Sequence, residues 1–140
     1  MTGVVTTTGG SLTIKLTELQ LAVMRVLWSR GEASVLDVQE ALRQGDRALA
    51  QTTVATLLSR LEKRGVAAYR LDGRQYVYRA LISEADVRES MLADVTHGLF
   101  RGDVTTLVSH LLSTSEVDEA DLVRVRALID ARVRKLKEHK

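Results

Sequence analysis

The sequence predicts a mainly α-helical protein of the α+β class, in which three helices and a β-hairpin precede a second group of helices. Three observations support this class. The 140 residues are rich in Leu, Val and Ala and include no proline. Apolar residues recur at the spacing i, i+3, i+4, i+7, which places them on one face of a helix. In residues 66–81 this period gives way to β-branched and aromatic residues on both sides of Asp72-Gly73.

Three helices are predicted in the first half of the chain. The first begins with a capping box, in which Thr17 and Gln20 satisfy unpaired amides of the first turn, and it ends at Gly31. Residues 34–45 and 48–65 carry the same signals, an apolar stripe at helical spacing and a glycine at the end. Residues 1–13 are small and polar and show no period, so we expect them to form a disordered tail.

A β-hairpin is predicted after the third helix. Asp72-Gly73 between two β-branched and aromatic runs indicates a tight turn whose two central residues both have positive φ. A short strand near Ala33 would add a third strand. Three helices followed by a hairpin are the order of a winged helix-turn-helix, in which the hairpin is the wing. We therefore expect a winged-helix DNA-binding domain over residues 14–82.

The predicted helix 48–65 has an unusual exposed face. Its apolar stripe is opposed by Thr and Ser, which are weaker helix formers than the Glu, Lys and Gln of an ordinary solvated face. Short hydroxyl side chains allow close approach to the major groove, contact phosphates or base edges, and pack a Thr methyl on thymine. A plain amphipathic helix with surface threonines is the alternative. The predicted DNA-contacting residues of this helix are Gln51, Thr52, Thr53, Thr56, Ser59, Arg60 and Lys63.

The wing contributes one further candidate. Arg74 lies near the predicted turn, where it would contact the DNA backbone or a narrow minor groove. A solvated hairpin arginine is an equal alternative. Tyr69, Tyr76 and Tyr78 are predicted to pack on the wing, because duplex DNA offers no free base faces for stacking.

Charge is distributed unevenly along the chain. Residues 47–80 contain seven basic and two acidic residues, a net charge of +5, whereas residues 81–140 contain nine basic and eleven acidic residues. A basic segment joined to a slightly acidic one is typical of a polyanion-binding module linked to a part with another task.

The sequence argues against an enzyme. It has no cysteine, no glycine-rich phosphate loop and no nucleophile motif, and its histidines, His97, His110 and His139, lack metal-ligand spacing. A metal site of His97, His110 and Asp94 is a remote alternative, so we expect no metal and no cofactor. No apolar run approaches the roughly 18 residues of a membrane span. We expect a soluble, cytoplasmic protein that does not insert into membranes.

Residues 83–140 are predicted to form a small helical dimerisation domain. About 60 helical residues make a marginal core when alone, and the apolar surface of these helices is too large to bury within one chain. A twofold homodimer resolves this excess. The residues expected to pair are Leu107, Leu111, Leu122, Val125, Leu128, Ile129 and Val133.

The sequence resembles the BlaI/MecI-type penicillinase repressors, a family that includes the CopY copper-responsive repressors. The matching stretches are LTELQLAVMRVLWSRGEASVLDVQEAL, TTVATLLSRLEKRGVAAYRLDGRQYVYRAL, LVSHLLS and DEADLVRVRALI. The resemblance implies a homodimeric winged-helix repressor that binds a double-stranded dyad operator, often of TACA/TGTA type. It carries the DNA-contacting role over to Thr52, Thr53, Thr56, Arg60 and Arg74. In several relatives the residues at Thr52 and Ala55 are basic, so with neutral residues here the resemblance does not carry over the identity of the preferred bases.

The resemblance also implies how repression ends. Family members that govern antibiotic resistance are released when a membrane metalloprotease sensor triggers cleavage in the dimerisation domain, often at an Asn-Phe bond. The corresponding bond here is His110-Leu111. The cysteine motif of the copper-responsive branch is absent.

Two other functions stay open. A dimeric winged-helix regulator could be released by a ligand that binds directly between the C-terminal helices. A winged helix could also serve as a protein-interaction module that binds no DNA.

Overall fold

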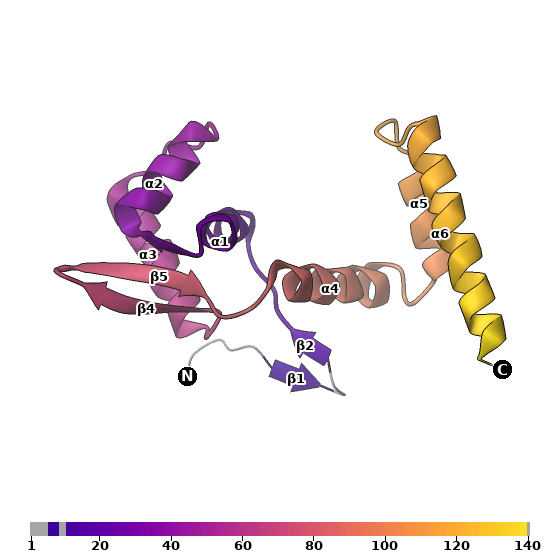
Figure 1. The fold of residues 1–140 in the computed structure, drawn as a ribbon, viewed down its shortest axis with the longest axis horizontal. Coiled ribbons are helices and arrows are strands. Elements are labelled where there is room, and N and C mark those ends of the chain that lie inside the picture. The colour runs from indigo at the N-terminus through magenta and orange to yellow at the C-terminus, as the bar shows by residue number, and fades with distance from the viewer. Residues whose placement is uncertain (1–5, 9–10, 140) are drawn as a thin grey trace. The chain divides into compact units, whose positions relative to one another are not determined.

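The computed structural model describes residues 6–8 and 11–139, and it divides into two compact units, Met1–Ala93 and Asp94–Lys140 (Figure 1). The predicted disordered tail falls largely outside the described residues, and its disorder stays a prediction. The backbone described there forms two short antiparallel strands, β1 (Thr6–Thr8) and β2 (Ser11–Thr13). The fold class, mainly helical with a small antiparallel sheet, is confirmed.

Three helices form the centre of the first unit: α1 (Glu18–Arg30), α2 (Val35–Gln44) and α3 (Gln51–Lys63). The predicted capping box of α1 is present, with the Thr17 amide donating to Gln20 Oε1 at 3.0 Å and the Gln20 amide donating to Thr17 Oγ1 at 3.1 Å. Helix α2 has an equivalent box of Ser34 and Asp37. Gly31 ends α1 at φ +83°, a left-handed conformation that glycine adopts without a Cβ clash.

Three strands form an antiparallel sheet in the order β3-β5-β4: β3 (Glu32–Ser34), β4 (Ala67–Asp72) and β5 (Gln75–Ala80). The predicted strand near Ala33 is therefore confirmed, and Ala33 pairs with Tyr78. The predicted turn is wrong by one residue. Asp72 pairs with Gln75, which leaves Gly73 and Arg74 as the two central residues, and of these Gly73 alone has positive φ, at +65°. This is the pattern of a type II′ turn, which needs glycine only at its first central position.

Helix α4 (Glu84–Asp94) lies, except for its last residue, in the first unit. Val87 is 2% exposed and belongs to the same core as α1 and α3. The Ser90 hydroxyl accepts from the Ile14 amide at 2.7 Å and donates to the Ile14 carbonyl at 3.2 Å. Trp28 Nε1 donates to the Ile82 carbonyl at 2.8 Å, which fixes the segment before α4. The domain boundary at residue 82 stays a prediction.

The second unit contains a π-helical turn (Val95–Leu99), α5 (Val104–Leu112) and α6 (Glu119–Glu138). Asp118 and Asp121 form a capping box at the start of α6. No side chain of residues 94–139 is buried. Within the described part of the chain, no helix is both long and apolar enough to cross a membrane.

Candidate nucleic-acid interface

Helix α3 separates an apolar face from a polar one, as predicted. Its inner residues Val54, Leu58 and Leu61 are fully buried and Leu57 is 8% exposed. At 100° per residue, Thr52, Thr56 and Lys63 lie on the side opposite this stripe. All seven predicted α3 residues are exposed except Ser59, which is half-buried. The helix thus presents hydroxyl and basic side chains together on one open surface.

The hydroxyls on this surface differ in what they offer. Thr56 Oγ1 donates to the Thr52 carbonyl at 3.0 Å, one turn earlier on α3. This bond occupies the hydroxyl hydrogen and leaves the oxygen of this exposed side chain free to accept. Thr56 is therefore suited to accept a hydrogen bond from a base or to contact a thymine methyl, whereas a phosphate would require it to break this bond.

Several cations of the basic segment are unpaired. Arg60, Lys63 and Arg74 form no ion pair with any described residue. By contrast, Arg47 Nη2 lies 2.8 Å from Glu18 Oε1, and Arg70 Nε lies 2.8 Å from Glu32 Oε2. Arg60, Lys63 and Arg74 keep their full charge for a polyanion, and they lie on α3 and at the wing tip.

The first turn of α3 has no side-chain cap. Its N-cap is Ala50, which has no oxygen to accept an amide, and the first turn contains no acidic residue. Helices α1 and α2 both have capping boxes. The first amides of α3 therefore have no side-chain acceptor within the described chain, and the positive end of the helix dipole is not neutralised there.

The wing places its predicted residue at its tip. Arg74 is the second central residue of the turn and is exposed. The tyrosines pack on one another as predicted: the ring centroids of Tyr69 and Tyr76 are 4.7 Å apart in an edge-to-face arrangement, and those of Tyr69 and Tyr78 are 5.8 Å apart. Tyr78 is 7% exposed, and this burial raises the pKa of its phenol.

One contact at the other end of α3 has no signal in the sequence. The half-buried Arg64, the C-cap of α3, donates from Nη1 to Gln20 Oε1 at 3.1 Å. The capping role of Gln20 was predicted from its spacing to Thr17. Its second role joins residues 44 positions apart in the sequence, which local patterns do not reveal.

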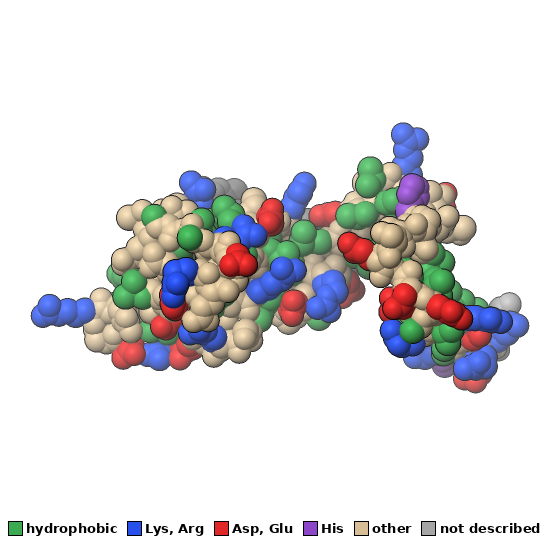
Figure 2. Space-filling view, turned by 90° about the horizontal axis from the view of Figure 1, so that it is seen from above, with side chains coloured by type: hydrophobic (Ala, Val, Ile, Leu, Met, Phe, Trp, Pro, Cys, Tyr) green, Lys and Arg blue, Asp and Glu red, His purple; other side chains and the backbone are tan. Residues whose placement is uncertain are grey.

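The residues predicted to pair two chains lie on α5 and α6. Leu107 and Val125 are half-buried and the other five are exposed, with Leu128 at 70%. Figure 2 shows hydrophobic side chains at the surface between charged ones on this unit. A helical unit without one buried side chain leaves its apolar surface available for another protein surface.

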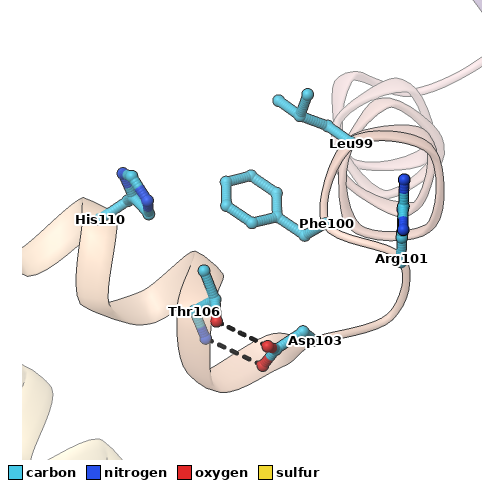
Figure 3. A pocket seen from close by; sticks show the side chains of 6 residues that line it. All are labelled: Leu99, Phe100, Arg101, Asp103, Thr106 and His110. Carbon is cyan, nitrogen blue, oxygen red and sulfur yellow. Dashed lines mark hydrogen bonds between the residues drawn. The ribbon is translucent and has the colours of Figure 1, made fainter.

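The predicted cleavage bond and a shallow pocket lie close together in the second unit. The bond His110-Leu111 lies inside α5. His110 also lines a pocket of about 490 Å³ with Leu99, Phe100, Arg101, Asp103 and Thr106 (Figure 3). The Phe100 and His110 rings meet edge to face with centroids 5.6 Å apart.

Asp103, the one carboxylate of this pocket, acts as a helix cap. It accepts hydrogen bonds from the Thr106 amide at 3.0 Å and the Thr106 hydroxyl at 2.6 Å, and these bonds lower the pKa of its carboxyl. It is therefore held as a charged acceptor and is not poised for acid–base chemistry. The remote alternative of a metal site has no support, since no three His, Cys, Asp or Glu side chains of residues 14–139 gather to hold a metal.

Comparison with known proteins identifies the family. The family model described as penicillinase repressor matches residues 16–131. The chain belongs to the penicillinase repressor family. Among the curated members, it is 34% identical to the transcriptional regulator BlaI of Mycobacterium tuberculosis over 118 residues, which cover 83% of this chain and 84% of that protein. It is 21% identical to the methicillin resistance regulatory protein MecI of Mammaliicoccus sciuri, over 84% of this chain and 95% of that protein.

A solved structure of the family is similar over about half of the chain. It is the solution structure of the monomeric form of Bacillus licheniformis BlaI in complex with the blaP half-operator, with 29% identity and a TM-score of 0.45. The match covers 52% of this chain and 88% of that chain. The family model and the curated relatives confirm the resemblance to penicillinase repressors, and these relatives are named as regulators, in agreement with the prediction that the chain is not an enzyme.

Proposed function

We propose that this penicillinase repressor family member is a DNA-binding transcriptional repressor that acts as a homodimer on a twofold-symmetric operator. The observation that carries the proposal is the exposed face of α3, where hydroxyl side chains lie beside the unpaired cations Arg60 and Lys63. The names of the relatives, which include a transcriptional regulator, and the half-operator complex of one of them support the same function.

In this proposal α3 lies in the major groove. Thr52, Thr53 and Thr56 contact base edges and thymine methyls, and Arg60 pairs with a guanine or a phosphate. Gln51 and the first amides of α3 approach the backbone, Ser59 and Lys63 follow it, and Arg74 reaches the neighbouring minor groove or its phosphates. Two such units on a dyad read half-sites about 10 base pairs apart, or a multiple of this.

The exposed apolar residues of the second unit support the proposed homodimer. A unit of this size whose side chains are all at least partly exposed gains little stability from its own packing. A second copy supplies the missing surface, and a twofold pairing places equivalent apolar residues opposite one another. The residues proposed to pair are Leu107, Leu111, Leu122, Val125, Leu128, Ile129 and Val133.

Release of the operator by proteolysis belongs to the same proposal. A membrane sensor protease would act upstream in a cytoplasmic pathway, and cleavage at His110-Leu111 would separate α6 from the rest of the chain. Because this bond lies inside α5, the helix must open locally before a protease can bind it as an extended segment. The pocket beside His110 favours a second candidate, release by a small ligand that binds there.

The experiment that tests the proposed function is fluorescence anisotropy with the full chain. Labelled duplexes from the region upstream of its own gene are compared with a scrambled duplex while salt is varied. Tight, competitor-resistant binding to the upstream duplex establishes a specific repressor, and affinity should fall steeply with salt because phosphate contacts release counterions. Absence of binding at low salt would overturn the proposal in favour of a protein-interaction module.

The two modes of release need a separate measurement. A shift of the melting temperature across a ligand panel, lost in Phe100→Ala, would indicate direct ligand release. Loss of operator binding on co-expression with the sensor protease, together with a fragment that ends at His110, would indicate cleavage.

A further inference from the structure

Two arginines that flank α3 in the sequence bind the first turn of α1. Before α3 begins, Arg47 donates from Nη2 to Glu18 Oε1 at 2.8 Å. After its last turn, Arg64 donates from Nη1 to Gln20 Oε1 at 3.1 Å. The two acceptors are two residues apart on α1, so one short segment holds the loop before α3 through Arg47 and the C-terminal end of α3 through Arg64.

The two ties differ in strength. The Glu18 side chain is 83% exposed, and exposed ion pairs contribute little to stability because water and salt screen them. Gln20 is 9% exposed, and its Oε1 atom uses both lone pairs, one for the Thr17 amide and one for Arg64. A charged donor to a shielded carbonyl makes a stronger bond than an exposed pair. The Gln20–Arg64 contact is therefore the principal tie.

We propose that Gln20 is a positioning residue for DNA recognition: by holding Arg64, it sets the angle at which α3 enters the major groove. The inference rests on the proposed function and adds a residue that itself touches no DNA. Base contacts are directional, so a small rotation of α3 about an unfastened end misplaces Thr52, Thr56 and Arg60 relative to base edges. Phosphate contacts tolerate the same rotation better.

The competing explanation is that Arg64 itself binds a phosphate. The two explanations predict opposite results for Gln20→Ala. If Arg64 is a phosphate contact, removal of Gln20 frees its guanidinium, and binding to all DNA stays equal or tightens. If Gln20 positions α3, removal weakens operator binding and leaves binding to scrambled DNA nearly unchanged.

The test measures operator and scrambled-duplex affinities of the full chain for five variants. Gln20→Ala and Arg64→Met each remove one partner, and the double variant closes a cycle. Gln20→Glu keeps an acceptor for both donors and serves as the rescue. Asp37→Ala is the matched control, because Asp37 fills the same position in the capping box of α2 and forms no hydrogen bond or ion pair with α3 in the described chain.

We expect Gln20→Ala to lose about tenfold in operator affinity, the effect of misaligning one base contact. Arg64→Met should lose the same, and the double variant should lose no more than either single variant, because the pair acts as a unit. Gln20→Glu and Asp37→Ala should bind the operator as the wild type does. Melting temperatures identify any variant that does not fold. If a Gln20 variant does not fold, the ratio of operator affinity to scrambled-duplex affinity of Arg64→Met decides whether the inference holds.

Three outcomes would overturn the inference. They are equal losses on operator and scrambled DNA, additive losses in the double variant, or the same operator loss in Asp37→Ala. Failure of the proposed function is distinguishable, because the wild type would then show no preference for the operator.

Discussion

Arg70 reaches Glu32 across the middle strand of the sheet. Arg70 lies on β4 and Glu32 on β3, with β5 between them, and two hydrogen bonds join them: Nε to Oε2 at 2.8 Å and Nη2 to Oε1 at 2.9 Å. This contact holds the pKa of the Glu32 carboxyl below its usual value. The carboxylate stays charged and largely neutralises Arg70, so Arg74 is the free cation at the end of the wing.

The first prediction compares these two wing arginines. Arg74→Ala should reduce the slope of log affinity against log salt by about 1, because one phosphate contact is lost. Arg70→Ala should leave the slope nearly unchanged, because Glu32 already balances its charge. Anisotropy titrations at several salt concentrations measure both slopes. Equal reductions in the two variants would show that the Glu32 contact opens when DNA binds.

The second prediction concerns Arg60 on α3. Arg60→Ala should cost about 1–3 kcal/mol of operator binding, the range for a bidentate contact to a base. Arg43→Ala removes the same charge from α2, where Arg43 Nε donates to Glu40 Oε2 at 2.7 Å, and should change binding little. Competition binding with the operator measures both variants. Unchanged binding by Arg60→Ala would remove Arg60 from the interface.

Contacts made within one turn were predictable from the sequence, and contacts between distant segments were not. The capping box of Thr17 and Gln20 was found because three residues separate the partners. The hairpin was found, but its turn was placed one residue early, because strand pairing of Asp72 with Gln75 decides where the turn begins. The hydrogen bonds between Arg64 and Gln20 and between Ser90 and Ile14 depend on how distant segments pack. The spacing of residues along the sequence does not encode this packing.

The predicted DNA-contacting residues show the same difference between local features, which the sequence predicts, and contacts between distant segments, which it does not. The exposed positions of α3 could be predicted because a helix with a buried stripe fixes which residues face outward. The sequence could not predict which cations are free of ion pairs, because Arg70 and Arg47 pair with carboxylates on other elements. The roles of the exposed residues toward DNA stay predictions.

The third prediction uses the uncapped start of α3. Ala50 has extended backbone angles that suit an N-cap, φ −67° and ψ 149°. Ala50→Ser should raise the free energy of unfolding by about 0.5–2 kcal/mol, because the new hydroxyl accepts a first-turn amide. Ala50→Asp should also stabilise the fold, yet its carboxylate should weaken operator binding by repelling phosphate. Thermal unfolding and anisotropy separate the two effects. Full affinity in Ala50→Asp would place the start of α3 away from the DNA backbone.

The fourth prediction concerns acid stability. The Ser34 amide and hydroxyl hold the pKa of Asp37 below its usual value of 3.8. A carboxyl whose pKa is lower in the folded state stabilises the fold above the unfolded pKa, and this contribution is lost as the pH falls through the folded pKa. The free energy of unfolding should therefore fall between about pH 5 and pH 2, and less steeply in Asp37→Asn.

Glu89→Gln is the control for this acid titration. Glu89 is exposed on α4 and forms no ion pair within residues 14–139, so its removal should leave the pH profile as in the wild type. Denaturant unfolding at a series of pH values measures all three proteins. A profile of Asp37→Asn that coincides with the wild type would mean that the α2 cap contributes nothing to acid stability.

The fifth prediction tests the dimer through one exposed leucine. Leu128 is 70% exposed on α6, and Leu128→Asp should produce monomers, because a carboxylate buried between two chains lacks a partner and its desolvation opposes pairing. The operator affinity of Leu128→Asp should also fall, because a monomer binds only one half-site. Leu36→Asp on α2 is the matched control, because Leu36 is 55% exposed on the first unit and its charge should leave pairing intact. Light scattering measures the mass of each protein. A wild type that scatters as a monomer at the concentrations used for DNA binding would contradict the dimer.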